Sequence, residues 1–264
     1  MKSAADELLN VTDPGACRAR RPLLIAHRGG VIGPGAPENS LAAIRWAAIQ
    51  GFDMVEVDVL ASADSQPVLF HDDWSGTLKA SCGLDTPVHE LTLDELRAIR
   101  YRATDEHIAG LDEALALCAE LRLGVMLDFK TEPAPDHLLA RVVALLDAHG
   151  MTRAAVTISH DAGVRAALTG RALVRVQPED AERAANLASR ALAGQFWFDL
   201  PEDLPDGQVG PLQRAGALVV PAINTFRYPP HAHRELAAAD AARLQAAGVD
   251  GFQIDAEYRD LFTS

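Results

Sequence analysis

The residues of this sequence that could do chemistry stand where apolar, strand-like runs end. His27 and Arg28 follow the aliphatic run 23–25, and His71 ends a second run, PVLFHDD. Two imidazoles on either side of one phosphate group suit acid–base catalysis near neutral pH, because one takes a proton while the other gives one. We therefore treat His27 and His71 as candidate catalytic residues; a metal ligand and a satisfied core histidine are the alternatives. The remaining histidines are interpreted as surface residues, with His160 left open as a pocket residue.

Carboxylates also stand near the ends of strand-like runs. Because side chains alternate along a strand, Glu56 and Asp58 share one face of the run 53–59, and Asp128 shares a face with Lys130. Three carboxylates at neighbouring strand ends repel one another unless positive charge lies among them. Glu56, Asp58 and Asp128 therefore predict a hard-cation site for Mg²⁺ or Ca²⁺, and salt bridges to arginines are the alternative.

Other strand ends repeat this pattern. The alternation predicts an inward face carrying Trp197 and Asp199 in QFWFDL, with Phe196 and Phe198 on the outer face. It also predicts three further inward residues, Arg175, Gln253 and Asp255. Arg28 offers a planar fork to a phosphate oxygen. Gly29 and Gly30 are expected to let substrate and metal approach bare backbone.

These residues can act together only in a fold that brings the strand ends close to one another. Strand-like runs alternate with helical ones along the whole sequence. The alternation predicts a parallel α/β sheet. The link from 53–59 to 67–71 is too short for a parallel crossover, so 67–71 is expected to form an antiparallel hairpin arm. The other runs predict a single (β/α)₈ TIM barrel over 22–264, after a flexible N-terminal arm over 1–21; an open doubly wound sheet is the alternative. The candidate strands are 23–27, 53–59, 67–71, 124–130, 154–159, 172–177, 195–199, 217–224 and 250–255.

Composition narrows the classes of partner. A formal net charge of −13 argues against a general nucleic-acid binder. A small phosphorylated substrate remains compatible if arginine, lysine or a cation supplies local positive charge. No apolar run approaches the ~18 residues of a membrane span, and no secretory leader is visible. Three cysteines without metal-type spacing favour a reduced, cytoplasmic compartment. The sequence leaves the oligomeric state open.

Taken together, the motifs resemble the glycerophosphodiester phosphodiesterase family of phospholipase C-like barrels. The resemblance implies hydrolysis of glycerophosphodiesters to sn-glycerol 3-phosphate and an alcohol, with Mg²⁺ or Ca²⁺. By position it implies His27 and His71 as the acid/base pair, Glu56 and Asp58 as metal ligands, and Arg28 and Lys130 as phosphate contacts. It also implies that Asn39 braces a loop and that Glu38 contacts the metal or its waters. The matching stretches are IAHRGG, APENSLAAIRWAAIQGFDMVEVDV, QPVLFHDD, HELTLDELRAI, LDFK and AAGVDGFQID.

Two departures from the family pattern bear on the substrate. Asp128 stands where the family usually has glutamate, and Asp-x-Lys is more similar to the related sphingomyelinase D group. The family's Trp-Thr-Val-Asn is reduced to PAIN, which keeps Asn224 and loses the tryptophan. A lysophospholipase D or sphingomyelinase D-like lipid phosphodiesterase is therefore a second reading, and a non-catalytic phospho-ligand-binding barrel a third. The candidate pocket-lining residues are Glu38, Asn39, Trp197, Asn224 and Asp255.

Overall fold

A curled, mainly parallel β-sheet forms the centre of the computed structural model, which describes residues 7–71, 77–131, 133–204 and 207–262. The ten strands run in the order β8-β7-β6-β5-β4-β2-β1-β10-β9, and β3 pairs with β2. The strands are β1 (Leu23–Ala26), β2 (Met54–Ala61), β3 (Pro67–Leu69), β4 (Gly124–Phe129), β5 (Ala155–Thr157), β6 (Leu173–Arg175), β7 (Gln195–Trp197), β8 (Leu218–Val219), β9 (Ala222–Ile223) and β10 (Gly251–Ile254).

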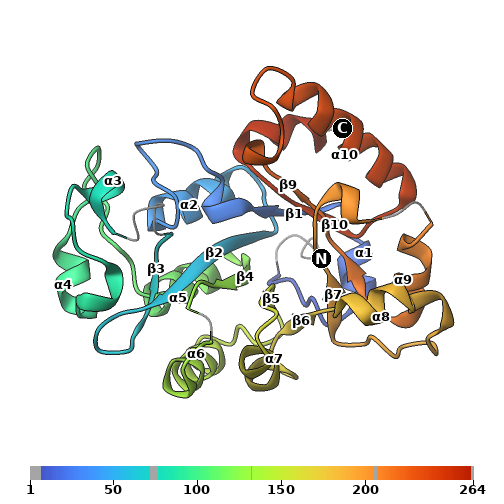
Figure 1. The fold of residues 1–264 in the computed structure, drawn as a ribbon, viewed down its shortest axis with the longest axis horizontal. Coiled ribbons are helices and arrows are strands. Elements are labelled where there is room, and N and C mark those ends of the chain that lie inside the picture. Colours follow the sequence, from blue (N-terminus) through green and yellow to red (C-terminus); the bar gives the residue numbers. More distant parts are fainter. Residues whose placement is uncertain (1–6, 72–76, 132, 205–206, 263–264) are drawn as a thin grey trace.

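Helices surround this sheet (Figure 1). Within the described residues none of them is long and apolar enough to cross a membrane. The α-helices are α1 (Pro14–Arg18), α2 (Leu41–Ile49), α3 (Lys79–Cys82), α4 (Leu93–Ala98), α5 (Leu111–Leu121), α6 (Asp136–Ala148), α7 (Ala162–Leu168), α8 (Pro178–Glu182), α9 (Val209–Ala215) and α10 (His233–Ala247).

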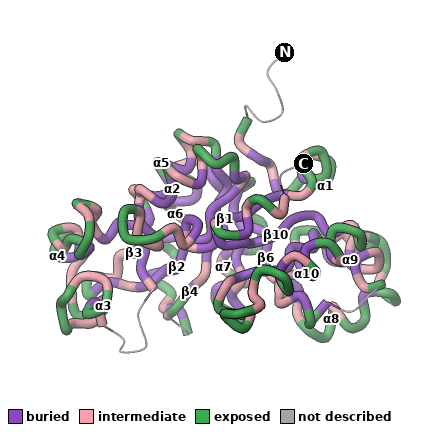
Figure 2. The backbone as a smooth tube through the Cα atoms, turned by 90° about the horizontal axis from the view of Figure 1, so that it is seen from above, coloured by how far each residue is buried: buried purple, intermediate pink, exposed green. Residues whose placement is uncertain are grey.

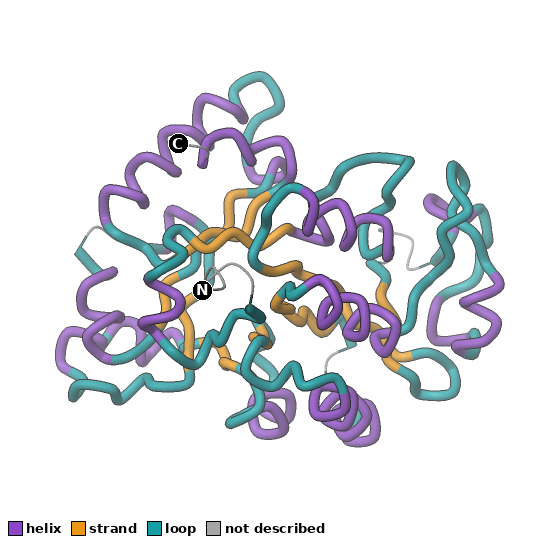
Figure 3. The backbone as a smooth tube through the Cα atoms, turned by 180° about the vertical axis from the view of Figure 1, so that it is seen from behind, coloured by secondary structure: helices purple, strands orange, loops and turns teal. Residues whose placement is uncertain are grey.

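The predicted barrel is confirmed, with one change at its closing strand. The run predicted as 217–224 is split: β8 pairs with β7, while β9 pairs with β10. Pro221 lies between the two pieces and has no N–H to donate to a ladder. Since both ends of the sheet path lie in this one segment, the strands curl into a ring, seen from behind in Figure 3.

The two faces of β2 and β4 follow the predicted alternation. Val55, Val57 and Val59 pack outwards in the large cluster that includes residues of α2 and α5. Met54 and Met126 belong instead to the apolar cluster inside the barrel. The acidic residues on these strands therefore share the inner face, at the carboxyl ends where barrel sites are built.

The hairpin arm is also confirmed, since β3 pairs antiparallel to β2. The chain beyond it forms a lobe with α3 and α4, at the left of Figure 1, before α5 returns to the barrel. This lobe has its own small core, which includes Leu78, Val88 and Leu96. The lobe lies beside the carboxyl ends of the barrel strands.

The prediction of a loose arm over 1–21 is wrong for its described part. Leu9, Val11 and Cys17 are at most 2% exposed and pack into the cluster inside the barrel. The Val11 amide donates to the Arg153 carbonyl at 2.8 Å. Figure 2 shows buried residues gathered along the strands and reaching into this segment. These apolar side chains close one end of the barrel; residues 1–6 lie outside the described part of the chain.

Candidate active site

A cavity of about 920 Å³ opens where the barrel, the lobe after β3 and residues 31–37 meet. Its size is in the range of small-molecule sites. Five residues singled out from the sequence line it: His27, Arg28, Glu38, His71 and Asp255.

His27 is held from behind. The residue is 8% exposed, and its Nδ1 lies 2.7 Å from Asp255 Oδ1. Asp255 also accepts hydrogen bonds from the backbone N–H and the hydroxyl of Thr225, at 2.6 and 2.7 Å. Burial raises the pKa of Asp255, but the bonds from His27 and Thr225 outweigh it and hold the pKa below its usual value.

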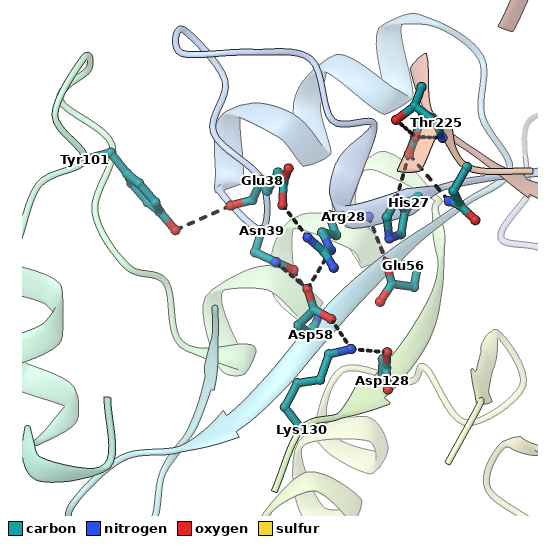
Figure 4. Close-up of polar contacts among 12 residues, drawn as sticks. His27, Arg28, Glu38, Asn39, Glu56, Asp58, Tyr101, Asp128, Lys130 and Thr225 are labelled. Atoms are coloured by element: carbon teal, nitrogen blue, oxygen red, sulfur yellow. Dashed lines mark hydrogen bonds and ion pairs between the residues drawn. The ribbon is translucent and has the colours of Figure 1, made fainter. Parts of the chain in front are cut away.

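Arg28 joins the cavity wall to the acidic residues beneath it (Figure 4). Its guanidinium lies 2.8 Å from Glu38 and 3.2 Å from Asp58. Burial lowers the pKa of Arg28, but Asp58 and Glu38 outweigh it, so the pKa lies above its usual value. Its backbone has φ of 48°, a left-handed conformation. This turn points the Arg28 N–H at Glu56 Oε2, 2.8 Å away.

Glu56, Asp58 and Asp128 form an acidic cluster, with one ligand atom from each lying within 4.8 Å of the others. Burial, followed by the charges of Asp58 and Asp128, raises the pKa of Glu56 well above its usual value. Burial likewise raises the pKa of Asp128. The sequence prediction that these three carboxylates converge is therefore correct in geometry.

Lys130 and Asn39 hold Asp58 in the cluster (Figure 4). The Lys130 ammonium lies 2.9 Å from Asp58 and also contacts Asp128. Asn39 donates to Asp58 Oδ2 at 2.8 Å and accepts from the Asp58 N–H at 2.9 Å. Burial raises the pKa of Asp58, but Lys130 and Arg28 outweigh it and lower the pKa below its usual value.

The donor set fits a hard divalent cation. All three ligands are carboxylates, the oxygen donors that Mg²⁺ and Ca²⁺ prefer. Burial, and after it the charges of Asp58 and Asp128, outweigh the Arg28 N–H and the Lys130 charge in setting the pKa of Glu56. A divalent cation would offset the repulsion among the three carboxylates, so Glu56, Asp58 and Asp128 could hold a metal ion.

His71 faces the same cavity from the end of β3. It is partly exposed, and burial together with the nearby charges of Arg28 and Lys130 lowers its pKa. Asp58 acts in the opposite direction on this pKa. The two candidate catalytic imidazoles thus line one cavity, beside the acidic cluster. Residues 72–76, which follow His71, lie outside the described part of the chain.

The glycines after Arg28 have a different role from the expected one. Both have positive φ, 79° for Gly29 and 125° for Gly30. A Cβ on Gly29 would lie 2.6 Å from the Ala43 Cβ, and one on Gly30 would lie 2.8 Å from the Trp46 ring. Their bare backbone therefore lets the strand end pack against α2, instead of leaving room for a ligand.

Three candidate pocket residues do not line the cavity. Asn39 lies beneath it with Asp58, and Asn224 lies 3.5 Å from Asp255 as a donor. Trp197 faces outwards into the helix layer, while Phe196 points into the barrel, so the predicted faces of β7 are inverted. Phe196, Trp197 and Phe198 are all aromatic, so polarity does not set the face at these three positions. Trp197 and His160 line a second cavity of about 420 Å³.

Several cavity residues were missed by sequence reasoning. Phe70 and Tyr101 stack with ring centroids 6.3 Å apart, and the Tyr101 hydroxyl lies 3.4 Å from the Glu38 carbonyl. Phe226 is 65% exposed beside the His27 ring. Tyr101 belongs to the lobe and Phe226 to the short 3₁₀ helix Thr225–Arg227, and no periodic pattern marks either residue as facing a site.

Fold and cavity together define an α/β barrel with a polar site at the carboxyl ends of its strands. Residues 27–148 match the model of the glycerophosphoryl diester phosphodiesterase family. This part of the chain is therefore similar to a domain of that family, in agreement with the resemblance that the motifs predicted.

Curated relatives match over part of their length. The human glycerophosphodiester phosphodiesterase 1 is 36% identical over 130 residues, which cover 44% of this chain and 38% of that protein. The mouse protein of the same name is 37% identical over 114 residues, 40% of this chain and 33% of that protein. The chain thus spans well under half the length of these relatives.

Solved structures match over nearly the whole chain and share its fold. A phosphodiesterase from Oleispira antarctica, in complex with the product sn-glycerol-3-phosphate, has a TM-score of 0.73 at 24% identity, covering 94% of this chain and 99% of that one. A glycerophosphodiester phosphodiesterase from Agrobacterium tumefaciens has a TM-score of 0.70 at 23% identity, covering 91% and 98%.

Proposed function

We propose that this protein is a metal-dependent phosphodiesterase that hydrolyses glycerophosphodiesters to sn-glycerol 3-phosphate and an alcohol. The observation that carries the proposal is the convergence of His27, His71 and Arg28 on one cavity, next to the acidic cluster. The family whose model residues 27–148 match and the product bound to the Oleispira antarctica structure support this choice of substrate.

In this proposal Glu56, Asp58 and Asp128 hold Mg²⁺ or Ca²⁺. A bound cation supplies charge neutralisation at the phosphate oxygens. Arg28, whose guanidinium reaches the cavity wall, binds a phosphate oxygen, and Lys130 adds a second positive charge from below. Both stabilise the charge that develops in the transition state.

The two histidines move the protons. One imidazole removes a proton from the nucleophile, which is water or a neighbouring hydroxyl of the substrate. The other donates a proton to the leaving alcohol oxygen, so that neither an alkoxide nor a hydroxide has to form free in solution. Burial and the charges of Arg28 and Lys130 lower the pKa of His71 in the free protein, and the negative charge of a bound phosphate would act in the opposite direction.

Single substitutions test this proposal. His27→Ala and His71→Ala are each expected to lower turnover at least about 100-fold, since proton transfer contributes on the order of 10²–10⁴. The matched control is His89→Ala, at an exposed position outside the residues that line the cavity. Release of sn-glycerol 3-phosphate is measured on a panel of glycerophosphodiesters, with EDTA, Mg²⁺ and Ca²⁺. More than a few per cent of residual activity in either variant, or full activity in EDTA, contradicts the proposal.

One observation favours a lipid phosphodiesterase as a second candidate. Away from the histidines the cavity is lined largely by apolar groups, which would suit an acyl chain better than a small polar alcohol. Turnover of lysolipids but not of soluble diesters would select this reading. The apolar lining residues are Val31, Pro34, Pro37, Phe70, Tyr101 and Phe226.

A non-catalytic phospho-ligand-binding barrel is a third candidate. It is selected if the protein binds a glycerophosphodiester but releases no product from any substrate with any cation. A cytoplasmic location remains a prediction from the composition, consistent with Cys17, Cys82 and Cys118 being free thiols.

A further inference from the structure

We propose that Asp255 is a positioning residue for His27, and that Thr225 in turn fixes Asp255. This inference rests on the proposed function for its catalytic consequence. Its structural part, the hydrogen-bonding state of the His27 ring, stands independently of any substrate. The contact joins the first strand of the barrel to the last, across 228 positions of sequence.

The geometry leaves Asp255 little freedom to turn. The residue is 1% exposed. Its Oδ2 accepts from the Thr225 N–H at 2.6 Å and from the Thr225 hydroxyl at 2.7 Å, while Oδ1 faces His27 Nδ1 at 2.7 Å. A carboxylate held at both oxygens keeps its orientation, so the imidazole ring must align with it. Thr225 belongs to the segment Thr225–Arg227, which also places Phe226 beside the His27 ring.

The contact also fixes which ring nitrogen is free. An ionised carboxylate is an acceptor only, so His27 Nδ1 must carry its proton and donate it to Asp255. Nε2 is then the nitrogen that bears the lone pair. His27 lines the cavity, so Nε2 is the atom that can exchange a proton with a bound substrate. In functional histidines, the hydrogen bond made by one ring nitrogen sets the tautomer and so the state of the other nitrogen.

The negative charge of Asp255 favours one of the two proton-transfer roles for His27. When Nε2 takes a proton, the ring becomes a cation, and the Asp255 carboxylate stabilises it without itself being protonated. His27 is therefore assigned as the base: the O–H bond of the nucleophile breaks, the N–H bond at Nε2 forms, and the electron pair of that O–H bond goes to phosphorus. His71 then supplies the proton for the leaving alcohol oxygen, which keeps the electron pair of the broken P–O bond.

A competing account gives Asp255 a structural role alone, as the acceptor that caps the turn at Thr225. The two accounts differ in what Asp255→Asn does. The isosteric amide can still accept from Thr225 but offers no negative charge to the His27 ring. A structural role predicts a change in stability only, whereas a positioning role predicts a change in the ring and in kcat.

The experiment compares Asp255→Asn and Thr225→Val with Asp250→Asn. Asp250 is a matched control because it is fully buried just before β10, whereas Asp255 follows that strand. It binds Arg21 and the Val219 N–H, away from the cavity residues. Asp250→Asn is expected to lower the melting temperature and leave kcat within about 2-fold at temperatures where it is folded.

Asp255→Asn is expected to lower kcat on the order of 10²–10⁴-fold with KM changed little, because a His27 ring in the wrong tautomer loses the contribution of positioned proton transfer. Thr225→Val, which keeps the backbone donor, is expected to lower kcat a few-fold. Equal effects of Asp255→Asn and Asp250→Asn on kcat would overturn the proposal.

A spectroscopic measurement separates this proposal from the choice of substrate. Nitrogen-15 NMR of histidine-labelled protein, with His27→Gln for assignment, reports which ring nitrogen of His27 carries the proton. Nδ1–H with a bare Nε2 in the wild type, lost or exchanging faster in Asp255→Asn, supports the proposal. A wild-type ring protonated at Nε2 alone overturns it, even if Asp255→Asn fails to fold. If no substrate is turned over, the proposed function fails, while the ring measurement still decides the role of Asp255.

Discussion

Glu56 offers a sharp test of the acidic cluster, because removing its charge should stabilise the metal-free protein while weakening metal binding. Glu56→Gln keeps the shape of the side chain and its acceptor for the Arg28 N–H. At the 4.8 Å limit of the cluster and an effective dielectric constant of about 20, each carboxylate pair repels by on the order of 3 kcal/mol. Lys130 offsets part of this repulsion. We therefore expect a net gain of about 1–3 kcal/mol in the unfolding free energy of the metal-free variant.

The sign of the pH dependence follows from the raised pKa of Glu56. A carboxyl group whose pKa is higher in the folded than in the unfolded state favours folding in its protonated form. Its contribution is present below the unfolded value and is lost as the pH rises through the folded value. The advantage of Glu56→Gln over wild type should therefore grow with pH over this window.

The assay is thermal unfolding in EDTA and with added Mg²⁺ or Ca²⁺. At this chain length about 1 kcal/mol corresponds to roughly 2–4 °C in melting temperature. A cation at 100 times its dissociation constant adds about 2.7 kcal/mol to the wild type, and should add much less to Glu56→Gln. A matched control is Glu120→Gln, on the outer helix α5. If Glu56→Gln is less stable than wild type in EDTA, or gains equally from the cation, the reasoning on the cluster is refuted.

Two further changes probe other parts of the molecule. Lys130→Met should lower kcat/KM by on the order of 10²-fold, and it should destabilise the metal-free protein because Asp58 and Asp128 lose a counter-charge. The control is Lys79→Met, since Lys79 forms an exposed surface pair. Wild-type activity in Lys130→Met would contradict the phosphate role. Leu9→Ala should lower the free energy of unfolding by about 2–4 kcal/mol, because it leaves a cavity at the closed end of the barrel. Chemical denaturation measures this loss, and a loss below about 0.5 kcal/mol would show that the segment does not support the core.

Patterns of short range were readable from the sequence. Alternation on β2 and β4 placed Glu56, Asp58 and Asp128 on one inner face, because polar and apolar residues contrast at every second position. The hairpin arm followed from a link too short for a crossover. The fold class followed from strand–helix alternation, which leaves a parallel sheet few ways to cover both faces.

Where local contrast is weak, the tertiary structure decided. The faces of β7 were inverted because its aromatic residues suit either side of the sheet. The N-terminal segment was expected to be loose because its few apolar residues are scattered, yet Leu9 and Val11 fill the end of the barrel, where a cavity would otherwise be left. The lobe that supplies Tyr101 to the cavity has no pattern that reveals which way it folds.

The sequence by itself determined the class of chemistry, since the residue types at the strand ends are fixed by local position. Only the tertiary structure decided how they are paired: Asp255 with His27, Arg28 with Asp58, and Lys130 between two carboxylates. Such pairs depend on closing the barrel, which brings together residues far apart along the chain. Local periodicity cannot encode that contact, because it is set by the packing of the whole ring of strands.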